Sequence, residues 1–218
     1  MTRLSHETTT VRKVVVFFDI CSSTKILEDL VASESQRAWR DLLISLKIFL
    51  NTRAEEYPVE IHKFIGDGWV LLFDQEKTTG VMLLEFCRRL AEKYQKEFTS
   101  RICPRLQSKD CVTGLTFGVD RGSLVRIIMN EQPEYIGRSL NVAARLQGAI
   151  KQKDERPAGK LLISNAAFVD LGLNRLKKYR STEVTRLLQN VSFGPAYQAR
   201  KIVVFRLTVL NSSRSKRK

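Results

Sequence analysis

The hydrophobic pattern of the chain combines short apolar runs with longer segments in which apolar residues recur at helical spacing. An uninterrupted apolar run over residues 14–18 is typical of a buried central strand, and we expect that strand to cover residues 12–19. Two runs rich in β-branched and aromatic residues, Val59–Ile65 and 69–73, flank the sequence Gly-Asp-Gly at 66–68, which favours a tight turn. The sequence therefore predicts a β-hairpin in addition to a central strand.

Helical spacing and turn-forming residues define the other expected elements. One helical stretch is predicted over residues 26–56, with a break near 33–35, and another over 78–98. A polar loop is expected over 101–109, followed by strands over 112–120 and 123–129 that are joined by a turn at 121–122. A loop over 131–137, a helix over 138–147 and a charged loop over 151–159 come next. The last expected elements are a short strand over 161–163, a short helix over 165–171, a strand or hairpin over 177–193 and a closing strand over 201–207.

This order of elements predicts an α+β fold with a largely antiparallel sheet flanked by helices. No G-x-G-x-x-G sequence is present, so a Rossmann fold is not expected. A length of 218 residues fits one domain, which we assign to residues 12–209. We expect residues 1–11 to be a flexible N-terminus and residues 210–218 to be a basic, disordered tail.

Composition narrows the classes of protein. The chain is 43% hydrophobic but has no apolar run as long as a membrane span and no signal-peptide pattern, so we expect a cytoplasmic protein. The four cysteines form no C-x-x-C pair and are expected to be reduced. Two histidines are too few for a histidine-based zinc site.

The formal net charge of +14 leaves two classes of ligand open, nucleic acid and a small polyanion such as a nucleoside triphosphate. We rank nucleic acid second because no DNA- or RNA-binding motif is recognisable.

Two carboxylates are the first candidates for chemistry. Asp19 follows the predicted central strand, and Asp67 lies in the predicted hairpin turn. Asp67 taken alone has a simpler interpretation as a turn former. If the strand and the hairpin are neighbours in one sheet, however, the two carboxylates meet at one end of it. Paired carboxylates at such a place suit hard divalent cations such as Mg²⁺ or Mn²⁺.

Polar residues near two predicted helix starts are candidates for binding phosphate and ribose. Ser22, Ser23 and Thr24 follow the central strand, at the expected start of a helix. These hydroxyl residues either only cap the helix or leave backbone N–H groups at its first turn free to bind an anion. Asn141 and Arg145 are four residues apart and share one helix face. Such a pair is either part of a solvated surface or a grip on ribose and phosphate, since arginine suits bidentate phosphate contacts.

Three motifs in this order, at residues 17–24, 63–67 and 137–146, resemble the class III nucleotidyl cyclase catalytic domain over nearly the whole chain. The resemblance implies a ferredoxin-like α+β core, a homodimer with active sites between the subunits, and two divalent ions, Mn²⁺ or Mg²⁺. It implies that nucleoside triphosphate is cyclised to the 3′,5′-cyclic nucleotide with release of pyrophosphate. No protein nucleophile is required, in agreement with the lack of a Ser-His or Cys-His signature.

The resemblance also implies a role for each candidate residue. Asp19, Asp67 and the Ile20 carbonyl would hold the metal ions, Asn141 would orient the ribose and Arg145 would stabilise the α-phosphate. The resemblance places Lys63 and Glu134 near the base, and the helix start makes Ser22, Ser23 and Thr24 candidates for the phosphates. Phe64 and Tyr135 are either core residues or bulky side chains that narrow the base pocket. The phosphate-binding lysine of the family has no clear counterpart, and Arg200 and Lys201 are the candidates to replace it.

The stretch at 135–137 departs from the usual adenylate and guanylate cyclase patterns. A cyclase domain of this kind is most similar to the bacterial pyrimidine cyclases of the Pycsar anti-phage system. That similarity implies synthesis of cyclic UMP, or of cyclic CMP, as a messenger for a separate effector protein. The alternatives are an adenylate cyclase and, outside the enzymes, an inactive cyclase-like regulator or a basic nucleic-acid-binding protein.

Overall fold

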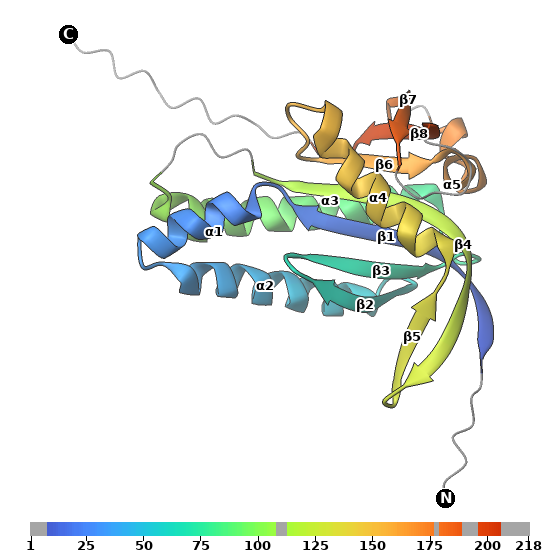
Figure 1. Ribbon diagram of the computed structural model, residues 1–218, viewed down its shortest axis with the longest axis horizontal. Coiled ribbons are helices and arrows are strands. Elements are labelled where there is room, and N and C mark those ends of the chain that lie inside the picture. Colours follow the sequence, from blue (N-terminus) through green and yellow to red (C-terminus); the bar gives the residue numbers. More distant parts are fainter. Residues whose placement is uncertain (1–7, 108–112, 177–178, 189–195, 206–218) are drawn as a thin grey trace, which may run out of the picture.

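The computed structural model describes residues 8–107, 113–176, 179–188 and 196–205 (Figure 1). The strands are β1 (Thr9–Ile20), β2 (Val59–Ile65), β3 (Gly68–Asp74), β4 (Leu115–Met129), β5 (Gln132–Ile136), β6 (Lys160–Ser164), β7 (Ser181–Leu187) and β8 (Ala196–Val203). The α-helices are α1 (Ser23–Ala32), α2 (Gln36–Ala54), α3 (Gly80–Glu97), α4 (Arg138–Lys153) and α5 (Asn165–Asp170). These elements confirm the predicted α+β class.

The strands form one sheet in the order β2-β3-β1-β4-β6-β8-β7, and β5 pairs with β4 outside this path. Every pairing is antiparallel except that of β4 with β6. The predicted central strand, β1, lies between β3 and β4. Since β3 belongs to the β2–β3 hairpin, the hairpin and the central strand are neighbours in one sheet, as the interpretation of the two carboxylates required.

Helices cover the two faces of the sheet unequally. Helices α1, α2 and α3 lie on one face, and α4 runs across β1 and β4 on the other (Figure 1). Successive residues of β1 point to opposite faces, as strand geometry requires. Val16 and Phe18 therefore pack with the large cluster under α2 and α3, whereas Val15 and Phe17 pack with Ala143 of α4. The uninterrupted apolar run in the sequence reflects this burial on both faces.

The predicted break in the first helical stretch is confirmed. Helix α1 ends at Ala32 and α2 begins at Gln36. Glu34 between them has a positive φ of 53°, and the Ser35 backbone N–H donates to the Leu30 carbonyl at 2.7 Å. Three polar residues together thus turn the chain from one helix into the next.

The predicted turn at residues 121–122 is wrong. Residues 115–129 form the single strand β4, which pairs with β1 from Leu115 to Arg126 and places Gly122 opposite Lys13. Backbone pairing with β1 keeps residues 121–122 extended, and a turn there would break this pairing. The hairpin turn lies instead at Asn130 and Glu131, whose φ angles of 49° and 63° suit a tight turn. As a result, the predicted loop over 131–137 is largely the strand β5.

Other boundaries also differ from the prediction. Strand β1 begins at Thr9, inside the segment that we expected to be flexible, and α4 continues to Lys153, into the predicted charged loop. The start of the predicted polar loop over 101–109 consists of short helical turns ending at Arg105. The expected tail over 210–218 lies outside the described residues.

Two further findings concern the expected properties of the chain. Cys21 and Cys87 are buried and unpaired, and Cys103 is exposed and unpaired, while Cys111 lies outside the described residues. None of the helices in the described part of the chain is long and apolar enough to cross a membrane.

Candidate active site

The two predicted carboxylates meet at one end of the sheet. Asp19 lies one residue before the end of β1, and Asp67 lies in the turn between β2 and β3. Gly68 makes this approach possible, because a Cβ atom at that position would collide with the Phe18 carbonyl oxygen. The turn itself uses a positive φ of 65° at Gly66, which favours glycine. The Gly-Asp-Gly sequence thus holds Asp67 against the end of the central strand.

The surroundings of Asp67 are unfavourable for a carboxylate that has no cation. Burial raises the pKa of Asp67, and the neighbouring Asp19 carboxylate raises it further. A hydrogen bond from the Ser23 hydroxyl opposes this rise. The second carboxylate oxygen, Oδ2, is buried and has no hydrogen-bond partner. Buried polar atoms are rarely left without a partner, so this oxygen is free to bind a ligand.

The partners of Asp19 come from α4. Lys151 Nζ lies 2.7 Å from Asp19 Oδ2, and Gln147 Nε2 donates to the same oxygen at 3.3 Å. Gln147 also donates to the Thr116 hydroxyl at 2.8 Å, which fixes its amide beside the carboxylate. Sequence reasoning did not select Lys151, because it ended the helix at residue 147 and assigned Lys151 to a loop. It did not select Gln147, because the partners of Gln147, Asp19 and Thr116, lie far away in the sequence. The available signal was the spacing of four residues between Gln147 and Lys151, which places both on one helix face.

These residues fit a site for hard divalent cations. Two carboxylates, one with an unpartnered oxygen, are oxygen ligands of the kind that Mg²⁺ and Mn²⁺ prefer. Ile20, whose carbonyl is the further expected ligand, ends β1 directly beside Asp19. In the described part of the chain, no group of three or more His, Cys, Asp or Glu side chains is placed to hold a metal. Water and substrate oxygens therefore have to complete the coordination of any ion bound here.

A cavity of about 270 Å³ lies on the α4 side of the hairpin. Lys63 of β2 and Glu134 of β5 both line it and form an ion pair, with Lys63 Nζ 2.6 Å from Glu134 Oε2. Asn141 of α4 also lines it. The lining residues are Phe17, His62, Lys63, Ile65, Val70, Glu134, Tyr135, Leu140, Asn141 and Ala144. The structure thus brings together four of the predicted nucleotide-binding residues, from three separate segments of the chain.

His62 belongs to this cavity although sequence reasoning did not select it. The pairing of β2 with β3 shifts register between Ile61 and Lys63, so His62 occupies a β-bulge. The bulge lets two consecutive side chains, His62 and Lys63, line the same cavity. Burial lowers the pKa of His62, and the nearby Glu134 opposes this change. His62 also contacts the edge of the Tyr135 ring at 5.1 Å between centroids.

Tyr135 is held by a second carboxylate. Its hydroxyl donates to Glu60 Oε2 at 2.7 Å, and its ring is 9% exposed. Because Tyr135 is anchored at both its ring and its hydroxyl, it acts as a fixed wall of the cavity. Its polar atom is already used and is not available to a ligand without losing that bond.

Three of the predicted residues do not join this cavity or the carboxylates. Phe64 is 51% exposed and packs at a tilt against Trp69, with 4.5 Å between ring centroids, in an apolar groove formed with α1 and α2. Arg200 lies 3.1 Å from Glu183, and Lys201 lies 3.0 Å from Asp154. The expected phosphate-binding role of Arg200 and Lys201 therefore requires them to leave their carboxylate partners.

The remaining predicted residues flank the carboxylates or α4. Ser22 has a positive φ of 57° at the junction of β1 and α1, Ser23 begins α1, and Thr24 is exposed in its first turn. Arg145 of α4 has a buried guanidinium nitrogen, Nη1, without a hydrogen-bond partner. Its guanidinium therefore has a donor to spare for a ligand.

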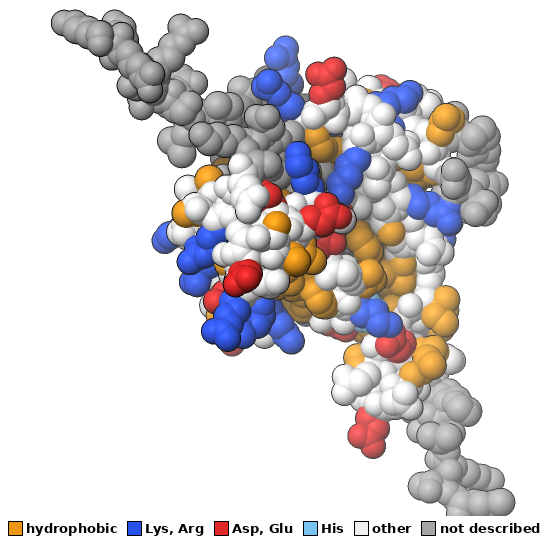
Figure 2. Space-filling view, turned by 60° about the vertical axis from the view of Figure 1, so that its left-hand side comes forward, with side chains coloured by type: hydrophobic (Ala, Val, Ile, Leu, Met, Phe, Trp, Pro, Cys, Tyr) orange, Lys and Arg blue, Asp and Glu red, His pale blue; other side chains and the backbone are white. Residues whose placement is uncertain are grey.

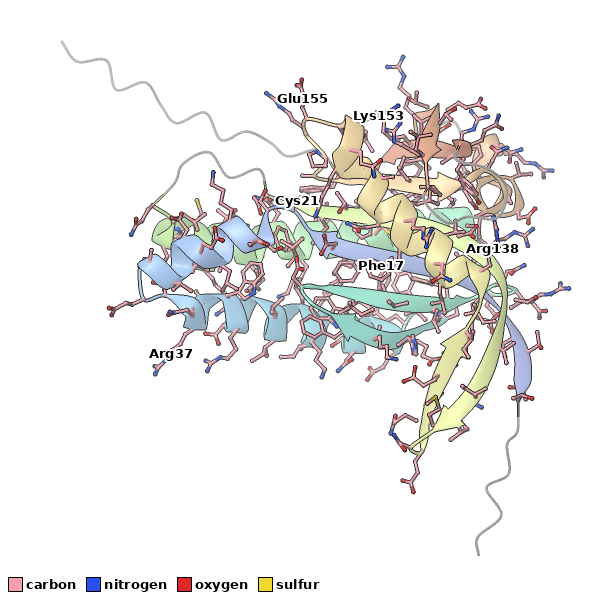
Figure 3. All side chains as sticks on the ribbon, viewed as in Figure 1. Phe17, Cys21, Arg37, Arg138, Lys153 and Glu155 are labelled. Atoms are coloured by element: carbon pink, nitrogen blue, oxygen red, sulfur yellow. The ribbon has the colours of Figure 1, made fainter. Side chains whose placement is uncertain are left out.

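Helix α4 connects the two groups of residues. Its first half contributes Asn141 to the cavity, and its second half reaches Asp19 through Lys151. Figure 3 shows α4 lying across β1, with Arg138 at one end, Lys153 at the other and Phe17 beneath it. One helix thus positions polar side chains at two places on the same face of the sheet.

Comparison with solved structures identifies the fold. The adenylyl cyclase CyaB from P. aeruginosa matches with a TM-score of 0.70 and 20% identity, over 92% of this chain and 97% of that one. The guanylyl cyclase Cya2 matches with a TM-score of 0.66 and 14% identity, over 90% of this chain and 93% of that one. The chain has the class III nucleotidyl cyclase fold.

A bacterial light-regulated adenylyl cyclase shares this cyclase fold, with a TM-score of 0.68 and 16% identity. The match covers 95% of this chain, but this chain spans only 56% of the length of that protein. No protein-family model matches the sequence, and no curated protein matches it. The expected fold is therefore established by structure, through matches at identities of 20% or less.

Proposed function

We propose that the protein is a nucleotidyl cyclase that converts a nucleoside triphosphate into its 3′,5′-cyclic form and pyrophosphate. The observation that carries this proposal is the meeting of Asp19 and Asp67, with one carboxylate oxygen buried and unpartnered, on a cyclase fold. Lys151, 2.7 Å from Asp19, offsets only part of the charge of two adjacent carboxylates, so the site favours a further cation. A metal–triphosphate complex supplies that cation together with its substrate.

Asp19, Asp67 and the Ile20 carbonyl would hold two divalent ions. When bound, these ions supply activation of the 3′-hydroxyl and neutralisation of the charge on the triphosphate. The contribution of the protein is to fix the carboxylates before the substrate arrives. Ser23 orients Asp67 and Gln147 orients Asp19, so neither carboxylate has to be ordered during the reaction.

Asn141 and Arg145 would act on the reacting part of the substrate. Arg145 has a buried Nη1 without a partner, which would stabilise charge that develops on the α-phosphate. Asn141, one helical turn earlier, would orient the ribose so that its 3′-hydroxyl is aligned with the α-phosphorus. These roles are carried over from the motif resemblance, and the unpartnered Arg145 nitrogen supports them.

Lys63 and Glu134 would read the base. A lysine only donates hydrogen bonds and an ionised glutamate only accepts them. Uracil offers two carbonyl acceptors on either side of an N–H donor, so it suits a donor placed beside an acceptor. Lys63 Nζ and Glu134 Oε2 are paired with each other at 2.6 Å, and the two side chains would separate to bind a base edge. We propose UTP as the preferred substrate and CTP as the second.

Further support for a pyrimidine comes from the walls of the cavity. Tyr135 is anchored to Glu60, and His62 is packed against its ring, so this side of the cavity is rigid. A cavity of about 270 Å³ with one fixed wall favours the smaller, single-ring bases. By the same motif resemblance, we propose that the cyclic product is a second messenger in anti-phage defence and is sensed by a separate effector.

We propose that the active unit is a homodimer whose sites lie between the subunits. The β4–β5 hairpin projects from the body of the molecule (Figure 1) and carries exposed apolar side chains. Figure 2 shows hydrophobic side chains gathered on the face between the body and this hairpin. The exposed apolar residues of the hairpin are Val125, Ile128, Met129 and Ile136. An apolar surface of this kind marks an interaction site.

One assay tests the proposed function. The purified protein is incubated with Mn²⁺ and each of the four nucleoside triphosphates separately, and the products are identified by mass. We expect cyclic UMP as the main product and no product from a protein carrying Asp67→Asn. Fastest cyclisation of ATP would replace the pyrimidine assignment with an adenylate cyclase, and no product from any nucleotide would overturn the proposed activity.

A further inference from the structure

The contact between Lys151 and Asp19 has no role in the cyclase mechanism described above. Lys151 Nζ lies 2.7 Å from Asp19 Oδ2, within the distance of a charge-assisted hydrogen bond. The pair is partly shielded from water, since the side chains are 41% and 21% exposed. The positive charge of Lys151 also acts to lower the pKa of Asp67. The lysine thus supplies positive charge to both carboxylates of the candidate metal site.

The position of this ammonium group conflicts with a divalent ion on the same oxygen. Two cations on Asp19 Oδ2 would repel each other at short range, so an ion that binds there has to displace Lys151. Lysine is suited to such a movement, because its ammonium is a point charge on a flexible four-carbon stem. Gln147, which is held by Thr116, is placed to keep Asp19 oriented while Lys151 moves.

A Lys151 side chain that has left Asp19 can bind the phosphate oxygens of a triphosphate. A triphosphate bound through metal ions at Asp19 and Asp67 brings several negative oxygens close to the ammonium group. The residues that the sequence suggested for the phosphate-binding role are occupied elsewhere, Arg200 by Glu183 and Lys201 by Asp154. Lys151 is therefore the lysine that already stands at the candidate metal site.

We propose that Lys151 is a displaceable counter-cation. It neutralises Asp19 while the site holds no metal, gives up that carboxylate to a divalent ion, and then binds the triphosphate. The second half of this inference rests on the proposed cyclase function, whereas the first half concerns metal binding alone.

The test uses Mn²⁺ alone and then Mn²⁺ with inorganic tripolyphosphate, which does not depend on base recognition. Free Mn²⁺ is measured by electron paramagnetic resonance in titrations of the nucleotide-free protein. Lys151→Met should bind Mn²⁺ about threefold to tenfold more tightly than the wild type, a range that corresponds to an ion pair of moderate strength. The same variant should bind Mn²⁺–tripolyphosphate more weakly, and Lys151→Arg should restore much of that affinity.

The matched control is Lys153→Met, which removes the same charge from the same end of α4. Lys153 is exposed (Figure 3), and its loss should leave both affinities unchanged. Unchanged or weaker Mn²⁺ binding by a folded Lys151→Met protein would overturn the competition with metal. Unchanged tripolyphosphate binding would overturn the transfer to phosphate. Absence of cyclisation by the wild type would overturn the proposed function but not the result with Mn²⁺ alone.

Discussion

At the scale of single residues, the charged carboxylate of Asp67 suits the proposed metal site but lowers the stability of the fold. Its raised pKa means that the folded state disfavours the charged carboxylate, so this group stabilises the fold at low pH and destabilises it at neutral pH. We therefore expect Asp67→Asn to raise Tm at pH 7 by about 2 °C or more, the size of a modest gain in a domain of this length. The same variant should lose Mn²⁺ binding and turnover.

Calorimetry of the metal-free protein, together with the Mn²⁺ titration, checks this prediction. Ser23→Ala is a useful comparison, because it removes the hydrogen bond that partly offsets the raised pKa of Asp67. A lower Tm for Asp67→Asn at pH 7 would contradict the expected conflict between the two carboxylates.

Glu97 illustrates the opposite case. Burial acts to raise its pKa, but hydrogen bonds from Lys93 and Arg101 prevail and lower it from 4.5 to about 2. A lowered pKa adds stability above the unfolded value, and this stability is lost as the pH falls from about 5 towards 2. We expect Glu97→Gln to cost about 1–2 kcal/mol of unfolding free energy at pH 7 and almost nothing near pH 2.

Urea unfolding at a series of pH values measures this difference. The exposed Glu28 of α1 offers a control, and Glu28→Gln should change the unfolding free energy little at any pH. A cost for Glu97→Gln that is independent of pH would show that its ion pairs do not stabilise the fold.

At the scale of elements, local sequence signals predicted what depends on local structure. The break between α1 and α2 and the β2–β3 hairpin depend on neighbouring residues, and both were predicted. The strand β4 depends on pairing with β1 over more than a hundred residues of chain, so Gly122 was mistaken for a turn. Strand β5 was missed for the same reason, because it pairs with the part of β4 that follows Gly122. Lys151 was missed because the helix was predicted to end at residue 147.

In the candidate site, too, features that depend on neighbouring residues were predicted and those that depend on distant strands were missed. Asp19 and Asp67 were selected from their places at a strand end and a hairpin turn, and Lys63 and Glu134 from the family resemblance. The structure brings them together as two pairs, Asp19 with Asp67 and Lys63 with Glu134. The direction of Phe64 was not predictable, because it depends on the bulge at His62, which shifts the strand register by one residue. Gln147 was hidden because its partner Thr116 lies on a distant strand.

The β4–β5 hairpin is the element to alter in a test of assembly. We expect Ile136→Lys to weaken the proposed dimer by at least tenfold, because Ile136 is 60% exposed on an apolar surface and lysine would be buried there. Sedimentation equilibrium measures the dimer dissociation constant. Val81→Lys on α3 is the matched control, since Val81 is 50% exposed on the opposite face of the sheet. Equal dissociation constants for the two variants would argue against the hairpin as the interface.

At the scale of the whole molecule, the proposed dimer shares its sites between subunits. Asp67→Asn and Arg145→Ala should each be inactive alone. When the two variants are mixed and exchange subunits, half of the dimers are mixed and each has one complete site, so about one quarter of the wild-type activity should return. A mixture that stays inactive, despite mixed dimers detected by native mass spectrometry, would place all catalytic residues within one subunit.

Helix α4 takes on a different meaning in such an assembly. Asn141 and Arg145 would serve the site completed by the carboxylates of the partner, while Gln147 and Lys151 serve the carboxylates of their own subunit. The ten helical steps from Asn141 to Lys151 span about 15 Å of a single rigid helix. Release of Lys151 by a ligand in one site would relax the far end of the helix that orients ribose in the other. The two sites would then be mechanically joined, and their occupancies would be cooperative rather than independent.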